Sequence, residues 1–230
     1  MADLDDRHWP QSALFTGHGD AGRTSLGSHG TVSKADIRVA ACGDCDEANA
    51  AVSVVMAVGN LPIGVNSTLA SVQNDLFDVV ADLSARADDA LRATARIHEF
   101  HLTRLERAID HFAREVPDPT DVGELVLPGG TIAAALLYQA RAVVRRAERT
   151  VWAARETHPS INPLCGGYLN RLSALLFTLA RAANAEHGDV EWVPEASALA
   201  MGQEDATQPI PDTDNTDTDT DTDTDTDTTK

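Results

Sequence analysis

Aromatic residues are scarce in this chain of 230 residues, since Phe, Trp and Tyr together make up only 4%. Strands in β-sandwiches and barrels draw heavily on aromatic side chains, so this scarcity argues against an aromatic-rich β architecture. No run of 18 or more apolar residues occurs, and the sequence therefore predicts no membrane-spanning helix. The first residues are acidic and lack an apolar stretch, so we expect no signal peptide and a cytoplasmic protein.

Lysine is nearly absent as well. Lys34 and Lys230 are the only two, and the other basic residues are arginines, against 36 Asp and Glu. The formal charge of −18 argues against binding to nucleic acid or to anionic lipid. Excess like charge keeps a protein soluble in strong salt, so the composition is typical of a halophilic protein. GC-rich codons would favour the same Arg and Ala, which leaves a second interpretation open.

Only three cysteines are present, so they cannot all pair within the chain. Cys42 and Cys45 have the C-x-x-C spacing of a metal or redox pair. A zinc site needs two more good ligands, and Cys165 alone is a poor supply of them. We therefore favour the interpretation that these cysteines are small apolar residues on a helix.

The middle of the chain has the hydrophobic periodicity of α-helices. Apolar residues at three- and four-residue spacing predict helices over residues 46–60, 68–88, 91–116, about 131–157 and about 165–186. Thr131 is the expected cap of the fourth helix, and Pro117 and Pro119 end the third. There is no βαβ alternation and no repeat of 20 to 50 residues. The predicted fold class is therefore all-α, a five-helix bundle.

Two further segments flank this predicted bundle of residues 35–206. Residues 1–34 include the stretch TGHGDAGRTSLGSHGTVSK, whose glycines exclude a helix, and composition alone favours a flexible leader. From Asp212 onward the chain is almost pure Asp-Thr alternation, with eight Asp and no apolar residue. Such a segment cannot offset the entropy of ordering, so residues 207–230 are predicted to be a disordered acidic tail.

Arginines gather on the fourth predicted helix. Arg141, Arg145 and Glu148 fall within about 60° of one another on its surface, with Arg146 and Arg149 to one side. A solvated face with Arg–Glu pairs is the ordinary interpretation. The alternative is a triphosphate site, because four arginines within nine residues of so acidic a chain form a local positive site. Guanidinium groups match phosphate and carboxylate in geometry.

Other polar residues on the predicted helices are candidates for the same site. Asn170, near the start of the last helix, is either an ordinary cap or a group that reads a ribose or a base edge. Asp46 on the first helix is a candidate counter-charge for an arginine of the fourth. His98 and His101 suggest a di-iron site, but the two Glu-x-x-His motifs that such a site needs do not occur.

Several unusual strings occur in one order: TGHGDAGRTSL, then VSK, D-E-x-N at 46–49, LPGG, AR-x-V-x-RRAER at 140–149 and YLNRLS at 168–173. Together they resemble the PduO-type corrinoid adenosyltransferases, which transfer the adenosyl group of ATP to cob(I)alamin. The resemblance runs from about residue 15 to residue 193. It implies a five-helix bundle that forms homotrimers with active sites between subunits, and it makes the glycine-rich segment a nucleotide loop.

The resemblance also implies an ATP site. The residues that would line the triphosphate and Mg²⁺ region are Thr16, Gly17, Gly19, Asp20, Gly22, Thr24 and Lys34. Arg145 would contact the phosphates, Glu148 and Arg146 would support it, and Asn170 would hold the nucleoside. Mg²⁺ would be bound through the ATP phosphates, and no protein ligand is assigned to it.

On the corrinoid side, the resemblance pairs Arg141 with Asp46, a link that the family uses to position the corrin. Leu125 stands where the family usually has Phe, and Tyr138 where it has His; both would face the corrin with Arg141. The implied catalytic set is Arg141, Asp46, Arg145 and Leu125. The family removes the lower axial ligand of cobalt and shields that face with apolar side chains, which eases reduction. Cob(I)alamin then attacks the ribose 5′ carbon and expels triphosphate.

Two functions remain open on the sequence. One is an active ATP:corrinoid adenosyltransferase that makes adenosylcobalamin and receives electrons from a corrinoid reductase. The other is a divergent, non-catalytic protein that binds ATP or a corrinoid. Leu125 motivates the second, as does the segment from Cys42 to Cys45, where the family commonly has Tyr-Gly-Thr-Val. Small molecules and copies of the same chain are the expected partners, and nucleic acid and membrane are not.

Overall fold

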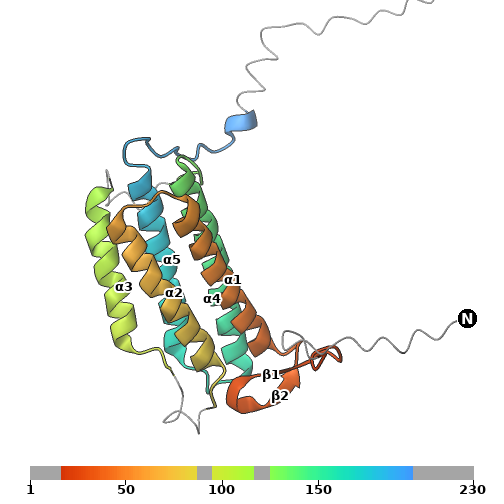
Figure 1. Ribbon diagram of the computed structural model, residues 1–230. Helices are drawn as coiled ribbons and strands as arrows, with labels where there is room; N and C mark the ends of the chain where they lie inside the picture. The colour runs from red at the N-terminus through yellow and green to blue at the C-terminus, as the bar shows by residue number, and fades with distance from the viewer. Residues whose placement is uncertain (1–16, 87–94, 117–124, 199–230) are drawn as a thin grey trace, which may run out of the picture. The chain divides into compact units, whose positions relative to one another are not determined.

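The computed structural model describes residues 17–86, 95–116 and 125–198. Within them the α-helices are α1 (Ile37–Val58), α2 (Ile63–Leu83), α3 (Glu99–Phe112), α4 (Ile132–Thr157) and α5 (Pro163–Ala183). Figure 1 shows the five lying side by side, and α4 packs against both α1 and α5. The predicted all-α five-helix bundle is thereby confirmed. No helix among the described residues is long and apolar enough to cross a membrane.

The chain divides into two compact units between Trp192 and Val193, and the five helices α1 to α5 belong to the first. The glycine-rich residues from Gly17 onward belong to that unit too. The predicted tail of residues 207–230 lies outside the described residues, as does Thr16. The domain boundaries proposed from the sequence stay predictions.

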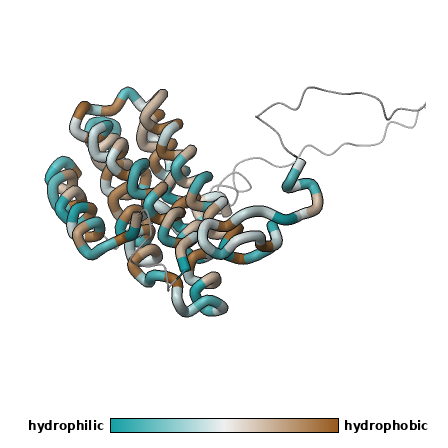
Figure 2. Tube along the Cα trace, turned by 60° about the horizontal axis from the view of Figure 1, so that its bottom comes forward, coloured by the Kyte–Doolittle hydropathy of each residue, from teal (hydrophilic) through white to brown (hydrophobic). Residues whose placement is uncertain are grey.

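The core consists of the apolar stripes from which the helices were predicted. Side chains at three- and four-residue spacing on α4 and α5 are at most 2% exposed: Leu137, Val144 and Val151, and Leu169, Leu172, Leu176 and Leu179. Figure 2 shows hydrophobic and hydrophilic stretches alternating along the helices, as expected for amphipathic segments. Burial of these stripes holds the bundle together.

The cysteines are part of this core. Cys42 and Cys45 lie in α1 and Cys165 in α5, and all three are free and buried. Burial raises the pKa of each thiol, which keeps it protonated. Because the thiolate is the form that binds metals and attacks disulfides, these sites favour neither chemistry. The interpretation as small apolar residues on helices is confirmed.

The first helix begins earlier than predicted, at Ile37 instead of residue 46. Asp36 caps it by accepting a hydrogen bond from the backbone nitrogen of Arg38 at 2.9 Å. Gly43 and Asp44 lower the helix propensity of this stretch, but Ala41 and Cys45 on the same turns are fully buried. Packing therefore overrides propensity here. The second helix is likewise shifted, to Ile63–Leu83 from the predicted 68–88.

The third helix is shorter than the predicted 91–116. It begins at Glu99, and a short 3-10 turn (Ala113–Glu115) follows its end at Phe112. The backbone before it is held by other elements: the nitrogen of Ile97 donates to the Asp82 carboxylate at 3.0 Å, and the Ile97 carbonyl accepts from Asn162 at 2.9 Å. Contacts that no local pattern reveals therefore prevent the helix from starting earlier.

The glycine-rich segment forms no α-helix among its described residues, as predicted, but it is ordered into a hairpin. Strands β1 (Arg23–Ser25) and β2 (Thr31–Ser33) pair antiparallel around a 3-10 turn. Leu26 is 5% exposed and joins the hydrophobic core. Gly27 has a φ of 43°, and a Cβ there would lie 2.4 Å from the Ser84 carbonyl oxygen. The hairpin thus packs against the end of α2, which composition did not suggest.

Asp36 offers a test of how this hairpin is tied to α1. Its carboxylate pairs with the Arg38 guanidinium at 2.7 Å, and Arg38 contacts His29 of the hairpin at 3.0 Å. The pair holds the pKa of the Asp36 carboxyl well below its usual range. We expect Asp36→Ala to lower the free energy of unfolding by about 1 kcal/mol at pH 7. Urea denaturation measures this, with the exposed Asp110→Ala as control.

The same variant should show a pH dependence of defined sign. A carboxyl whose pKa is depressed by folding stabilises the native state above its unfolded pKa and loses that contribution as pH falls. The difference between wild type and Asp36→Ala should therefore shrink between about pH 5 and pH 2. A difference that stayed constant over this range would contradict the assigned pairing.

Candidate active site

Glu148 and Asn170, two of the predicted ATP-binding residues, meet in the folded chain. The amide nitrogen of Asn170 on α5 donates to the Glu148 carboxylate on α4 at 3.2 Å. The Asn170 carbonyl oxygen accepts from Arg171 at 2.9 Å, which fixes the orientation of the amide. Arg145 lies one turn before Glu148 on α4 and is exposed. The predicted site residues of the last two helices thus share one surface.

Arg146 is held by carboxylates of α1. It pairs with Glu47 and lies 3.6 Å from the Asp44 carboxylate, which also accepts from Thr150 at 2.6 Å. Asp46 is exposed, and no ion pair joins it to Arg141 among the described residues of this chain. The predicted Arg141–Asp46 link is therefore not made among the described residues of one chain, and the pairing stays a prediction.

Arg141 and Tyr138 carry the most unusual contacts of the region. The Nε of Arg141 and the hydroxyl of Tyr138 are buried and have no hydrogen-bond partner in the described part of the chain. The Arg141 guanidinium lies 5.0 Å from the centre of the Phe177 ring, against which Tyr138 packs edge-on. Burial and the charge of Arg145 lower the pKa of Arg141. Buried donors without acceptors are costly, which points to a ligand or a second chain that supplies them.

Leu125 belongs to an exposed apolar surface. Residues 125–127 pair antiparallel with residues 190–192: the nitrogen of Leu127 donates to Val190 at 2.7 Å, and that of Trp192 to Leu125 at 2.6 Å. In such a two-stranded ribbon, every second side chain of a strand points to the same side, and residues directly opposite each other share that side. The side chains on that side are 46–66% exposed: Leu125, Leu127, Val190 and Trp192. We call them the apolar ribbon face, and exposed patches of this kind mark binding surfaces.

Trp192 was missed by the reasoning from sequence. It lies beyond the last predicted helix and in none of the motifs, yet it faces Leu125 across the ribbon. A signal was available, because a tryptophan is conspicuous in so aromatic-poor a chain. Its indole supplies the flat, apolar group that Leu125 lacks.

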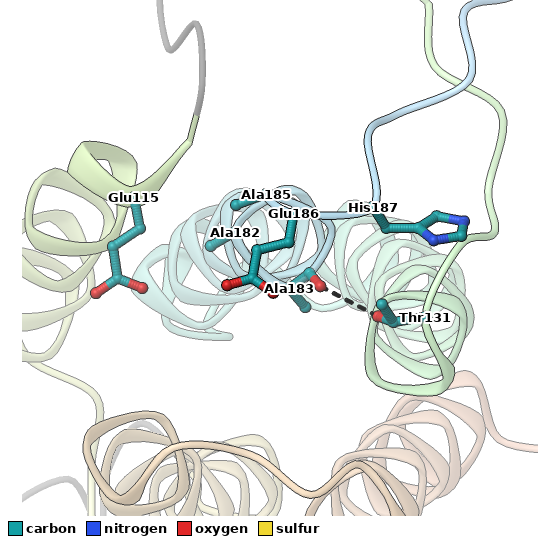
Figure 3. Close-up of a pocket in the computed structure, with 7 residues that line it drawn as sticks. All are labelled: Glu115, Thr131, Ala182, Ala183, Ala185, Glu186 and His187. Atoms are coloured by element: carbon teal, nitrogen blue, oxygen red, sulfur yellow. Dashed lines mark hydrogen bonds between the residues drawn. The ribbon is translucent and has the colours of Figure 1, made fainter.

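An open pocket of about 510 Å³ lies at this end of the bundle. Its lining comes from the turn after α3, the start of α4 and the end of α5: Glu115, Thr131, Ala182, Ala183, Ala185, Glu186 and His187. Figure 3 shows the Thr131 hydroxyl bonded to the Ala183 carbonyl, with the Glu115 carboxylate across from Glu186. Two carboxylates would repel a triphosphate, so this pocket suits neutral amides or cations.

The hairpin brings together part of the predicted phosphate loop. A Cβ at Gly19 would lie 2.8 Å from the Lys34 Nζ, so the ammonium sits directly on the glycine backbone. The backbone nitrogen of Lys34 donates to the Gly22 carbonyl at 2.9 Å. Glycine backbone beside a lysine ammonium is an arrangement that binds phosphate groups.

The remaining loop residues lie on the same hairpin. The Asp20 nitrogen donates to the Gly17 carbonyl at 3.1 Å in a turn, and Thr24 pairs with Val32 between the strands. Figure 1 places the hairpin at one end of the bundle and the start of α4, which follows the Leu125 segment, at the other. With 26 residues, α4 spans about 39 Å. One chain therefore does not bring Lys34 to Leu125.

Comparison with known proteins adds a family to this geometry. The sequence profile of the family described as cobalamin adenosyltransferase matches residues 14–183. The corrinoid adenosyltransferase of Mycobacterium leprae is 45% identical over 186 residues, which cover 79% of this chain and 95% of that protein. The corrinoid adenosyltransferase of Bacillus subtilis is 34% identical over 200 residues, with 85% and 98% covered.

A solved structure extends the likeness to three dimensions. A variant of the PduO-type ATP:corrinoid adenosyltransferase from Lactobacillus reuteri, complexed with cobalamin and ATP, superposes with a TM-score of 0.69. It is 33% identical, and the match covers 78% of this chain and 98% of that one. The residues that the family profile matches, 14–183, contain the helical bundle, the hairpin and the arginine-bearing face of α4. By profile, by identity and by fold, the chain belongs to the cobalamin adenosyltransferase family.

Proposed function

We propose that this chain transfers the adenosyl group of ATP to a reduced corrinoid, in a site shared between the subunits of a homotrimer. Membership of the family supports the ATP-dependent adenosylation. The observation that carries the shared site is the pair of buried, unpartnered donors, Arg141 Nε and Tyr138 Oη. They lie among residues that the family resemblance assigns to the corrinoid, and they need acceptors that the described part of one chain does not provide.

ATP is held by cations from two sources. The Lys34 ammonium on the glycine-rich hairpin and the Arg145 guanidinium on α4 neutralise the triphosphate, and Mg²⁺ binds through the phosphates. The Asn170 amide, oriented by Glu148 and Arg171, holds the nucleoside. Charge neutralisation makes triphosphate a better leaving group, and fixed binding aligns the ribose 5′ carbon with the attacking cobalt.

The corrinoid lies on the apolar ribbon face. Leu125 and Trp192 cover one face of the macrocycle and exclude water from it, which disfavours an axial ligand there. Cobalt without that ligand is reduced more easily, so an electron from a corrinoid reductase suffices. Amide groups at the rim of the corrin match the carboxylates of Glu115 and Glu186 in the adjoining pocket. We expect the reaction to take place in the cytoplasm, where ATP is available.

A site between subunits would bring the hairpin of one chain close to the site residues on α4 of another. If the hairpin of one subunit lies against α4 of the next, the partner subunit's Lys34 approaches Arg145, which stands in the middle of α4, about 18 Å of helix from the end near the hairpin of its own chain. The same contact brings the partner subunit's Asp46 to the Arg141 guanidinium. Heterologous contacts of this kind close into a ring, as in a trimer.

A spectral assay tests the reaction. We expect the protein, mixed with ATP, Mg²⁺ and chemically reduced cobalamin in high salt, to convert cob(I)alamin to the alkylated, light-sensitive product. Salt is included because the charge of −18 calls for screening. ATP that raises the melting temperature without this spectral change would favour the alternative, a non-catalytic binding protein.

The role of Arg145 is tested by its removal. Arg145→Ala should lower kcat/KM by about 100-fold or more, because it deletes a cation that stabilises the developing negative charge of triphosphate. Arg149→Ala is the matched control, since Arg149 is an exposed arginine one turn further along the same helix. Equal activity of Arg145→Ala and wild type would remove Arg145 from the site.

Mixing of variants tests whether the site is shared. Lys34→Ala and Arg141→Ala should each be nearly inactive as homo-oligomers. If each site takes Lys34 from one subunit and Arg141 from another, random co-assembly of the two variants leaves about a quarter of the sites intact. Activity that stayed at the level of the separate variants, in oligomers shown to be mixed, would place both residues in sites of a single chain.

A further inference from the structure

Asn184 joins three parts of the chain at the end of α5. It is 3% exposed. Its amide oxygen accepts from the Thr131 nitrogen at 3.0 Å, and its amide nitrogen donates to the Gly129 carbonyl at 3.1 Å and to the Asp189 carboxylate at 3.1 Å. One side chain therefore binds the start of α4, the loop before it and the segment after α5.

Two further contacts strengthen this junction. The other carboxylate oxygen of Asp189 accepts from Arg181 Nε at 2.9 Å, and both side chains are only 13% exposed. The Thr131 hydroxyl donates to the Ala183 carbonyl at 3.2 Å. We call Thr131, Arg181, Asn184 and Asp189 the polar clamp. Its donors and acceptors are matched in low-dielectric surroundings, where such networks rigidify a structure.

Gly130 shows how closely the loop approaches the clamp. Its φ is 89°, a conformation that favours glycine. A Cβ at this position would lie 2.3 Å from the Asn184 amide oxygen and 2.5 Å from its nitrogen. A side chain here would force Asn184 out of its hydrogen bonds, because the backbone at Gly130 has no room to move away without breaking them.

The clamp adjoins both strands of the apolar ribbon. Gly129 follows Leu127 by two residues, and Asp189 directly precedes Val190, so the clamp fixes one end of each strand. It also adjoins the buried donors: burial raises the pKa of Tyr138, and the charge of Asp189 raises it further. The position of the ribbon face relative to α4 and α5 thus depends on Asn184.

We propose that Asn184 is a positioning residue for the corrinoid: through the polar clamp it holds the apolar ribbon face in register with Tyr138 and Arg141. The inference rests on the proposed function, because it assigns the corrinoid to that face. The hairpin with Lys34 lies at the other end of the bundle and does not share the clamp. Loss of Asn184 should therefore weaken use of the corrinoid and spare the binding of ATP.

Asn184→Ala is the first test. We expect KM for cob(I)alamin to rise about 10-fold or more, since small misplacements of a binding surface are costly, with KM for ATP within about twofold of wild type. Asn162→Ala is the matched control: it removes the same residue type from the other end of α5, where Asn162 is the N-cap. It should lower stability and leave the ratio of the two KM values unchanged.

Hydrogen exchange and binding supply readouts that need no turnover. The amide protons of Leu127 and Trp192, bonded across the ribbon, should exchange at least about tenfold faster in Asn184→Ala, with α1 and the middle of α4 unchanged. Cobalamin should quench the tryptophan fluorescence of the wild type. The same quenching of Asn184→Ala should require a higher concentration of cobalamin. If wild type bound cobalamin in this way but formed no product, the proposed function would fail and the positioning role would stand.

Gly130→Ala is a second variant that disturbs the clamp from the opposite side. It should also raise KM for cob(I)alamin. In the double variant Gly130→Ala/Asn184→Ala, KM should rise by less than the product of the two single increases, because both substitutions act on one contact. The double variant Asn184→Asp/Asp189→Asn, in which the two side chains are exchanged, should recover part of the cobalamin affinity that Asn184→Asp alone loses. Unchanged cobalamin affinity and unchanged exchange at Leu127 and Trp192 in Asn184→Ala would overturn the inference.

Discussion

A partly buried guanidinium without an anion is the constraint on which the rest of this site depends. Arg141 lies over the Phe177 ring, and its Nε is buried without a partner in the described part of the chain. Burial, and to a lesser extent the charge of Arg145, lower the pKa of Arg141. Cation–π attraction offsets only part of the desolvation cost. The bundle tolerates this because its apolar core is extensive. In the proposed function, substrate and a second subunit supply the missing partners of Arg141.

The polar contacts around α4 show which of its charged side chains are paired among the described residues and which are not. Arg146 is matched by Asp44 and Glu47 of α1, and Glu148 by Asn170 of α5. These pairs fix the helix in place and leave Arg145 and Arg141 to external anions. At the end of the bundle, the polar clamp similarly satisfies its own groups and leaves an apolar surface free. In the proposed function, the sites for the two substrates use the groups that the described chain leaves unpaired or exposed.

Much of the fold was predictable because the helices are amphipathic. Leu169, Leu172, Leu176 and Leu179 give α5 a buried stripe at helical spacing, and Thr131 caps α4 as expected. Predictions were wrong where tertiary contacts decide the backbone. Asp82 and Asn162 hold Ile97 outside α3, and no local pattern encodes that.

The candidate site was predictable from the sequence only in part. The arginines and Asn170 stand in distinctive motifs, and a resemblance to a family gave them roles that spacing alone left open. Trp192 and Asn184 stand outside every motif, and their importance comes from contacts over long sequence distances, across the ribbon and through the clamp. The Arg141–Asp46 link is not made among the described residues of one chain, and we propose that it forms between subunits, which neither a sequence pattern nor the fold of one chain can place.

The central claim is that Arg141 is completed from outside its own chain. The most direct measurement is the distance between the Arg141 guanidinium and the nearest carboxylate in a crystal structure of the protein with ATP and cobalamin. We expect the partner subunit's Asp46 within about 3.5 Å of Arg141, with the corrin on the apolar ribbon face. A guanidinium that remained unpaired at the subunit interface, or that paired with a carboxylate of its own chain, would contradict this.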